Sequence, residues 1–242
     1  MAANIQKLIE ENYASKINFK EAQLKNLQDQ VNEHFLYNTL DSIHWLARKE
    51  NAAQASQMVF ALANFYRISL SAGNDIIPVR DVVNMITNYL YIQKLRMKDA
   101  VSYHVSCDPS LDDALMPKRL LQPLIENALV HGLKDHGKPL EIRVLLEKTS
   151  DNIRVSVADN GSGFTEERLK QVQEQLGPSC AAANQSFALK TIQSQILLYY
   201  NINYCINIES APGKGALVWF EVPVMRIKDR RGEPRDGNND YY

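Results

Sequence analysis

Residues 1–72 contain neither glycine nor proline, the two residues that most often interrupt a helix. Apolar side chains recur in this segment mostly every three or four positions, at Ile5, Leu8 or Ile9, Tyr13 and Ile17, and then at Leu24, Leu27, Val31 and Phe35. This spacing predicts an amphipathic, coiled-coil-like helix. The polar run 48–51 predicts a turn, and residues 52–71 predict a second helix. Because two helices cannot enclose a core alone, we expect residues 1–74 to form a helical hairpin that pairs with a second copy in a dimeric four-helix bundle.

The pattern changes after Asn74, where helical and strand-like segments follow one another. Pro78 is expected to open a helix that runs to about Met97, and Pro117 a helix that ends near His131 and Gly132. The remaining segments are a helix after Thr165, a helix at 185–200, and alternating apolar strands at 101–108, 140–147, 152–158, 204–210 and 215–222.

These strands come in adjacent pairs and do not alternate strictly with helices. A two-layer α/β sandwich with a mixed sheet therefore fits residues 75–225 better than a doubly wound parallel sheet. With the helical hairpin in front of it, the fold class is α+β. Residues 226–242 are polar, and we predict a disordered tail there.

The overall composition narrows the function only by exclusion. A net charge of -1 gives no general attraction to nucleic acid or to anionic membranes, so we expect no nucleic-acid partner. Three cysteines without a CxxC pair favour a reducing compartment. There is no signal peptide and no run of about 18 apolar residues, so no membrane-spanning helix is expected within this chain.

The first residue that could carry chemistry is His34. It lies three residues after Val31, at the edge of the apolar seam of the first helix. One interpretation is a histidine half-buried in a helix interface. The other is a nucleophile, because a neutral imidazole can attack the γ-phosphate of ATP and hold the phosphoryl group as a phosphoramidate. The spacing alone leaves both open.

A second candidate site is the segment LQPLIENALVHG at 121–132. Asparagine is unfavourable within a helix, so Asn127 needs a reason, and one is that its side-chain oxygen can coordinate Mg²⁺. His131 lies four residues later on the same helix face, where it could meet a phosphate. The alternative is that His131 and Gly132 only end the helix, as a cation in the last turn and a C-cap glycine.

A third candidate site is VADNGSGF at 157–164, a strand that runs into DxGxG. Asp159, at the strand end, could accept a hydrogen bond from the amino group of adenine. Gly161 and Gly163 would let the backbone approach a planar ligand. Because Asp-Asn-Gly is also common turn chemistry, a simple turn is the alternative.

In this order, HFLYN, QPLIENALVHG, DNGSGF and the Gly-Lys-Gly hairpin at 213–215 resemble the sensor histidine kinases of the YesM/LytS-like type. The segment YLYIQKLRM at 89–97 resembles the helix with which the ATP domain of that family begins. The similarity spans residues 20–223. It implies that residues 75–225 have the Bergerat-type, or GHKL, ATP-binding fold that is shared with gyrase, Hsp90 and MutL.

The resemblance also implies roles for single residues. His34 would be the phosphoacceptor, Asn127 the ligand of Mg²⁺, and Asp159 the carboxylate that reads adenine. Gly161 and Gly163 would border the base pocket. Two further residues belong to the same motif helix as Asn127, namely Glu126 as a second catalytic residue and His131 as a contact to the nucleotide.

Two positions depart from the family pattern. The family usually has proline before the acceptor histidine, where this chain has Glu33, so we expect a straighter acceptor helix. The ATP lid, which has a GxGL-like turn in the family, here reads Ser186-Phe187-Ala188-Leu189. We expect Ser186, Ala188 and Leu189 to lie against the nucleotide. If these positions need a positive φ, serine and alanine cost roughly 1–2 kcal/mol each, and ATP binding is weakened.

The leading hypothesis is an enzyme, a protein-histidine kinase that uses ATP to phosphorylate His34 and then a response-regulator aspartate. One alternative is a weak or inactive dimeric signalling scaffold, suggested by the altered lid. Another is a GHKL-type ATPase, although those enzymes carry a catalytic glutamate four residues before the asparagine, where this chain has Pro123. The resemblance further implies a homodimer and the cytoplasmic portion of a membrane sensor, with the membrane segments lying outside this chain. Neither the stimulus nor the regulator is specified.

Overall fold

The structure is a computed structural model that describes residues 39, 42, 43, 45, 52–69, 75–133, 138–176, 187–202 and 206–226. The chain divides into two compact units, residues 1–56 and 57–242. The few described residues before position 52 are helical. The predicted acceptor helix with His34, the turn at 48–51 and the predicted tail after Arg226 lie outside the described residues. None of the described helices combines the length and the apolar character that crossing a bilayer requires.

The first long helix, α2 (Ala52–Ser69), confirms the helix predicted at 52–71. In the second unit it packs against α3 (Val79–Met97), which begins directly after Pro78 as predicted. The Phe65 ring of α2 is buried and lies 5.7 Å from the Tyr89 ring of α3, measured between centroids. The Tyr91 hydroxyl donates a hydrogen bond to Gln57 Oε1 at 2.8 Å.

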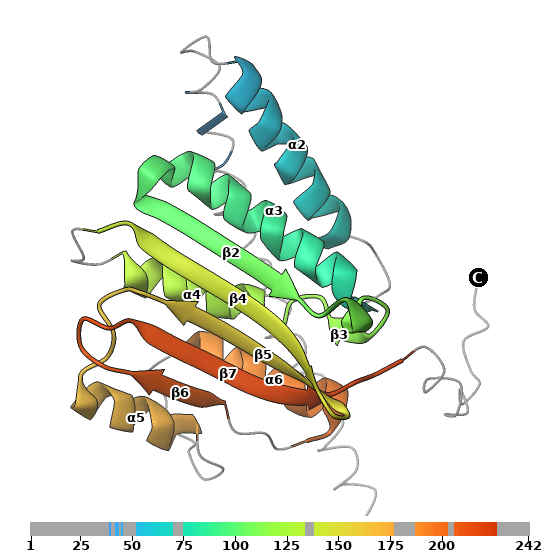
Figure 1. The fold of residues 1–242 in the computed structure, drawn as a ribbon, viewed down its shortest axis with the longest axis vertical. Coiled ribbons are helices and arrows are strands. Elements are labelled where there is room, and N and C mark those ends of the chain that lie inside the picture. The colour runs from blue at the N-terminus through green and yellow to red at the C-terminus, as the bar shows by residue number, and fades with distance from the viewer. Residues whose placement is uncertain are drawn as a thin grey trace, which may run out of the picture. The chain divides into compact units, whose positions relative to one another are not determined.

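The second unit is built on a five-stranded mixed sheet, which Figure 1 shows nearly face on. Its spatial order is β2 (Val101–Cys107), β4 (Leu140–Thr149), β5 (Asn152–Asp159), β7 (Ala216–Pro223) and β6 (Asn207–Ser210). The β2–β4 pair is parallel, and the other three pairs are antiparallel. This confirms the mixed sheet that the paired strands predicted.

One face of the sheet carries the core. Alternate residues of the strands are buried on this face, among them Val144 of β4, Val155 of β5 and Phe220 of β7. The helices α4 (Gln122–Gly132) and α6 (Phe187–Tyr200) cover it and lie behind the strands in Figure 1. The sheet is one layer and the helices packed on this face are the other, which gives the two layers predicted from the sequence.

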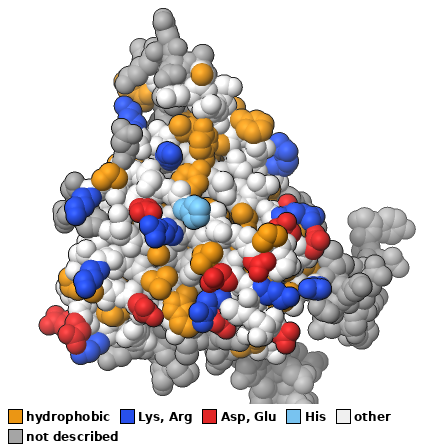
Figure 2. All heavy atoms as spheres, viewed as in Figure 1, with side chains coloured by type: hydrophobic (Ala, Val, Ile, Leu, Met, Phe, Trp, Pro, Cys, Tyr) orange, Lys and Arg blue, Asp and Glu red, His pale blue; other side chains and the backbone are white. Residues whose placement is uncertain are grey.

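The opposite face of the sheet is polar. Figure 2, in the same view, shows acidic and basic side chains scattered over it among apolar ones. Arg154 joins two strands here, with its Nη2 2.7 Å from Glu221 Oε1 and its guanidinium 4.5 Å from the centre of the Trp219 ring. Such pairs let an uncovered face stay in water, so only the helical layer can enclose an apolar cavity.

The expected helix from Pro117 begins later than predicted. Pro117 instead ends a short strand, β3 (Leu115–Pro117), which pairs antiparallel with β1 (Ile76–Pro78), and α4 starts at Gln122. Strands of three residues are too short for the alternation of buried and exposed positions to show in a sequence. The backbone N–H of Lys118 also donates to the Asp75 carbonyl at 2.9 Å, which extends this pairing.

Candidate functional site

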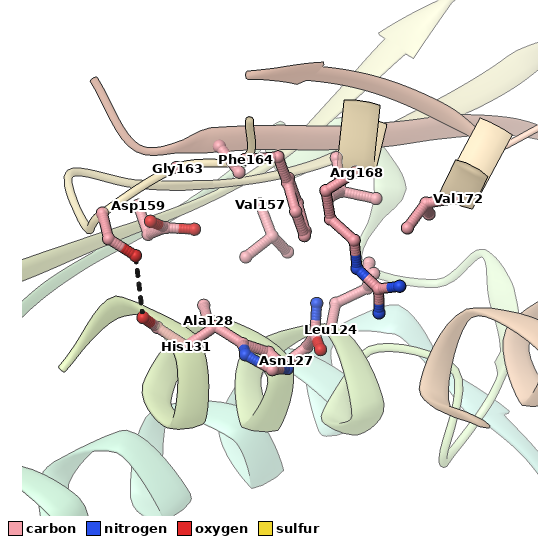
Figure 3. Close-up of a pocket in the computed structure, with 13 residues that line it drawn as sticks. Leu124, Asn127, Ala128, His131, Val157, Asp159, Gly163, Phe164, Arg168 and Val172 are labelled. Carbon is pink, nitrogen blue, oxygen red and sulfur yellow. Dashed lines mark hydrogen bonds between the residues drawn. The ribbon is translucent and has the colours of Figure 1, made fainter. Parts of the chain in front are cut away.

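A cavity of about 320 Å³ lies between α4 and the segment that connects β5 to helix α5 (Glu166–Leu176), as Figure 3 shows. Helix α4 contributes Leu124, Asn127, Ala128 and His131. The loop after β5 and helix α5 contribute Asp159, Ser162, Gly163, Phe164, Arg168 and Val172, while Val157, Ala216 and Val218 come from the sheet. Several apolar side chains with a few polar groups among them are typical of a small-molecule site.

Helix α4 holds its polar side chains toward the cavity by its apolar packing. Ile125 and Leu129 are buried in the core, which fixes the rotation of the helix about its axis. Asn127 and His131 therefore lie one turn apart on the face that borders the cavity, as their spacing predicted. The asparagine that is unusual in this helix thus lines the cavity.

Asp159 ends β5 and turns into the cavity. One of its carboxylate oxygens, Oδ1, accepts a hydrogen bond from the Gly161 backbone N–H at 2.8 Å. The next side chain, Asn160, accepts from the Glu141 backbone N–H at 2.7 Å and so fixes the turn to β4. The motif therefore forms the turn that was the simpler interpretation, and Asp159 also lines the cavity.

Glycine is required in this loop for close backbone packing. A Cβ on Gly161 would overlap Gly132 Cα of α4, so Gly161 lies against that helix and outside the cavity lining. Gly163, with φ +67°, does line the cavity, and a Cβ there would overlap the Ala211 carbonyl. Of the two glycines expected to border a base pocket, Gly163 lines the cavity and Gly161 does not, because Gly161 packs against α4.

Serine hydroxyls hold the loop to its neighbours. Ser210 Oγ donates to the Gly215 carbonyl at 2.6 Å and accepts from the Phe164 backbone N–H at 2.8 Å. Ser162 Oγ donates to the His131 carbonyl at 3.4 Å, the dashed line in Figure 3. The turn between β6 and β7 is therefore part of the cavity's support. These serines did not stand out before the fold was known, because serine is an ordinary residue in a turn.

The remaining predicted site residues lie elsewhere. Glu126 is mostly buried beside the cavity helix, accepts a hydrogen bond from Gln122 Nε2 at 2.8 Å and does not line the cavity. Burial raises the pKa of the Glu126 carboxyl, and the Gln122 contact lowers it by a smaller amount. His34 and Ser186 fall outside the described residues.

The two described lid positions belong to the first turn of α6. Leu189 is buried in the core, and Ala188 is half-buried. Neither lines the cavity. Ala188 is helical, so the left-handed strain considered for this position does not arise. The altered lid sequence therefore gives no backbone penalty at Ala188.

Arg168 is a charged cavity residue that the sequence did not indicate. It comes from the first turn of α5, and Figure 3 shows its guanidinium reaching toward Asn127 and Leu124, away from Asp159. The cavity thus has a carboxylate at one end and a guanidinium at the other. Among the described residues, no three His, Cys, Asp or Glu side chains come together as a metal site. A cation held here would take Asn127 as a ligand and the rest of its oxygens from phosphate and water.

Two family models match the chain. Residues 22–101 match the model described as "Histidine kinase", and residues 112–226 match "Histidine kinase-, DNA gyrase B-, and HSP90-like ATPase". The second matched range contains every residue that lines the cavity.

Similar curated proteins include "Sensor histidine kinase YesM" of Bacillus subtilis (strain 168), 32% identical over 223 residues, which are 92% of this chain and 37% of that protein. "Sensor protein LytS" of Oceanobacillus iheyensis is 30% identical over 210 residues, 86% of this chain and 36% of that protein. The chain thus spans little more than a third of the length of these relatives. Among solved structures, the histidine kinase domain of the Erythrobacter litoralis EL346 blue-light activated histidine kinase has a TM-score of 0.47 and 16% identity, and covers 79% of this chain and 93% of that one.

Proposed function

We propose that this chain, which belongs to the sensor histidine kinases of the YesM and LytS type, phosphorylates its own His34 with ATP and then passes the phosphoryl group to a response-regulator aspartate. The observation that carries the proposal is the meeting of two separate motifs in one cavity. Asn127 and His131 of α4 face Asp159 and Gly163 of the β5 loop, about 30 residues further along the chain. The cavity lies in the range that matches the ATPase-type family, so it is the natural place for the nucleotide.

The nucleotide would lie lengthwise in the cavity. Asp159 would accept a hydrogen bond from the adenine amino group, with Gly163 against the base. The phosphates would then extend toward Asn127, which would be the protein ligand of Mg²⁺. That cation would neutralise charge on the phosphate oxygens.

The transfer itself joins one nitrogen of the His34 ring to the γ-phosphorus. The bond from that phosphorus to the β,γ-bridging oxygen breaks, ADP leaves, and the ring loses its proton to solvent or a neighbouring base. In a second transfer a carboxylate oxygen of the regulator bonds to the phosphorus, the N–P bond of the phosphohistidine breaks, and the ring takes up a proton to become neutral imidazole again. Glu126 is mostly buried and bonded to Gln122, so within this proposal it acts by holding α4 and has no part in moving a proton.

The division of the chain follows from the same proposal. Residues 1–74 would pair with a second copy and present His34, residues 75–225 would bind ATP, and 226–242 would be a tail. Helix α2 supports pairing, because Phe60 and Val59 are 68% and 48% exposed, respectively, which is unusual for large apolar side chains. By analogy with its relatives, the chain would be the cytoplasmic portion of a membrane-bound sensor.

The test is to incubate the chain with γ-labelled ATP and Mg²⁺ and to follow protein-bound label. We expect label that is stable in base and lost in acid, absent from His34→Ala and unchanged in His104→Ala, a matched control at an exposed position of β2. Label that survives His34→Ala would remove the acceptor assignment. Bound nucleotide without label would favour the scaffold, and free phosphate without labelled protein would favour the ATPase.

A further inference from the structure

We infer that Arg168 binds the phosphates of the nucleotide and makes the cavity selective for the number of phosphates. This inference rests on the proposed function and adds a residue to it that belongs to none of the recognised motifs. It would make α5 a binding element of the cavity, opposite the helix that carries Asn127.

The start of α5 places Arg168 in a defined position. Thr165 caps the helix, since its Oγ1 accepts from the Arg168 backbone N–H at 3.3 Å and its carbonyl accepts from the Leu169 N–H at 2.9 Å. Val172, one turn after Arg168, is buried and also lines the cavity. This face of α5 is therefore turned inward, whereas Glu166 and Lys170 pair with each other on the exposed side.

The Arg168 side chain points toward the end of the cavity near Asn127, where the phosphates would lie. In Figure 3 the guanidinium lies near Asn127 and Leu124, and Asp159 and Gly163 lie at the opposite end of the cavity. If the adenine sits at Asp159, the chain of phosphates runs toward the guanidinium. A ligand placed the other way would bring anionic phosphate against a carboxylate, which is unfavourable.

The chemistry of the guanidinium suits this end. It carries five N–H donors and no acceptor, and its planar geometry matches phosphate oxygens in pairs. In the described structure its Nη1 donates to Gln171 Oε1 at 3.4 Å, which is long for a hydrogen bond. A phosphate oxygen is the stronger acceptor and would replace this neutral amide.

The test compares Kd for ATP, ADP and AMP, with Mg²⁺ present, in the whole chain and in Arg168→Gln. We expect Arg168→Gln to weaken ATP binding about tenfold to a hundredfold, ADP less, and AMP by less than about threefold, because the charge-assisted contact is to the β- and γ-phosphates, which AMP lacks. Arg168→Lys should restore part of the ATP affinity. Lys170→Gln is the matched control, since it removes the same charge from the same helix on its exposed side, and it should change each Kd by less than about twofold.

The outcomes separate this inference from the proposed function. Tight ATP binding by the wild-type chain with no change in Arg168→Gln would overturn the role of Arg168 and leave the nucleotide site standing. Equal losses for ATP and AMP would show a structural effect and would also overturn it. No nucleotide binding by the folded wild-type chain would overturn the proposed function and this inference together.

Discussion

The two walls of the cavity differ in how they are held. Helix α4 lies against the sheet and α6, and buries Leu124, Ile125 and Leu129. Helix α5 packs on the edge strand β6, and Val172 is the one side chain buried among those described for it. One wall is therefore a core helix that also lines the cavity, and the other is a surface helix that lines the cavity with its first turns.

This difference explains which residues the sequence could reveal. On α4 nearly every position is constrained by either the core or the cavity, so a polar asparagine among apolar residues is conspicuous. On α5 a charged residue in a polar helix looks like an ordinary solvated position. Cavity-lining residues on a surface helix such as α5 are found only once the fold shows which way that helix faces.

The largest loss of stability is expected where the backbone of the turn between β6 and β7 packs directly against the backbone at the end of β5. Gly215→Ala would place a Cβ into the Asp159 carbonyl at φ +78°, with no flexible side chain to yield. We expect a loss of at least about 4 kcal/mol in the free energy of unfolding, measured by urea denaturation, together with loss of ATP binding. Gly213→Ala is the matched control, since it also has a positive φ but meets nothing within 4 Å. It should cost only about 1–2 kcal/mol, and equal losses would disprove the packing explanation.

The contribution of each wall to the free energy of unfolding can be measured by truncating one apolar residue in α4 and one in α5. Leu124→Ala should lower the free energy of unfolding by about 2–4 kcal/mol, because it opens a hole between core elements. Val172→Ala removes fewer atoms from a peripheral helix and should cost roughly 1–2 kcal/mol. Thermal and urea unfolding of both variants would decide this. A larger loss at Val172 would mean that α5 belongs to the core.

The Glu126 carboxyl of α4 makes the stability of the chain depend on pH. Because burial raises the pKa of Glu126, the folded chain binds this proton more tightly than the unfolded chain, and stability falls as pH rises through the folded pKa. Glu126→Gln keeps an acceptor for Gln122 and removes the charge. We expect it to stabilise the chain at pH 8, where the wild-type carboxylate is charged. The gain should fade as pH falls toward the ordinary value of 4.5.

Urea midpoints between pH 4.5 and 8 would measure this effect, with the exposed Glu209→Gln of β6 as control. A loss of stability in Glu126→Gln at pH 8 would mean that the carboxylate is stabilising as an ion. Glu126 would then have a favourable partner beyond Gln122, which would contradict the expectation that its charge destabilises the folded chain.

The smallest effect is expected at the cap of α5. Thr165→Ala removes the acceptor for the Arg168 N–H and should cost about 0.5–1 kcal/mol, since this hydrogen bond is long and exposed. The loss should be local, so hydrogen exchange of the first-turn amides of α5 should rise while those of α4 stay protected. Equal changes in both helices would contradict the separation of the two walls.

Much of the fold could be predicted from the pattern alone. The five strands of the main sheet, the cap at Thr165 and the helices α2, α3, α5 and α6 follow from periodicity, proline position and capping chemistry. The strands β1 and β3 could not be predicted, because three residues show no period. The start of α4 was missed for the same reason, since Pro117 resembles a first-turn proline until β3 is known.

The site was predictable where a residue is unusual in its surroundings. Asn127 in a helix and Asp159 at a strand end stood out, and both line the cavity. Gly161 was assigned to the base pocket, but the structure uses it to bring the loop against Gly132. The positions of Arg168 at the cavity and of Ser210 in its support could not be foreseen, because they depend on contacts between elements far apart in the chain.

The most direct test of the cavity as the ATP site is base discrimination at Asp159. Adenine presents an amino donor where guanine presents a carbonyl, so a carboxylate there should favour ATP over GTP by about tenfold or more, by the strength of one charged hydrogen bond. In Asp159→Asn the amide can donate or accept, and this preference should fall to within about threefold. Calorimetry with ATP and GTP on both proteins would measure it. Equal affinity for the two nucleotides in the wild-type chain, or a preference unchanged in Asp159→Asn, would contradict the placement of adenine in this cavity.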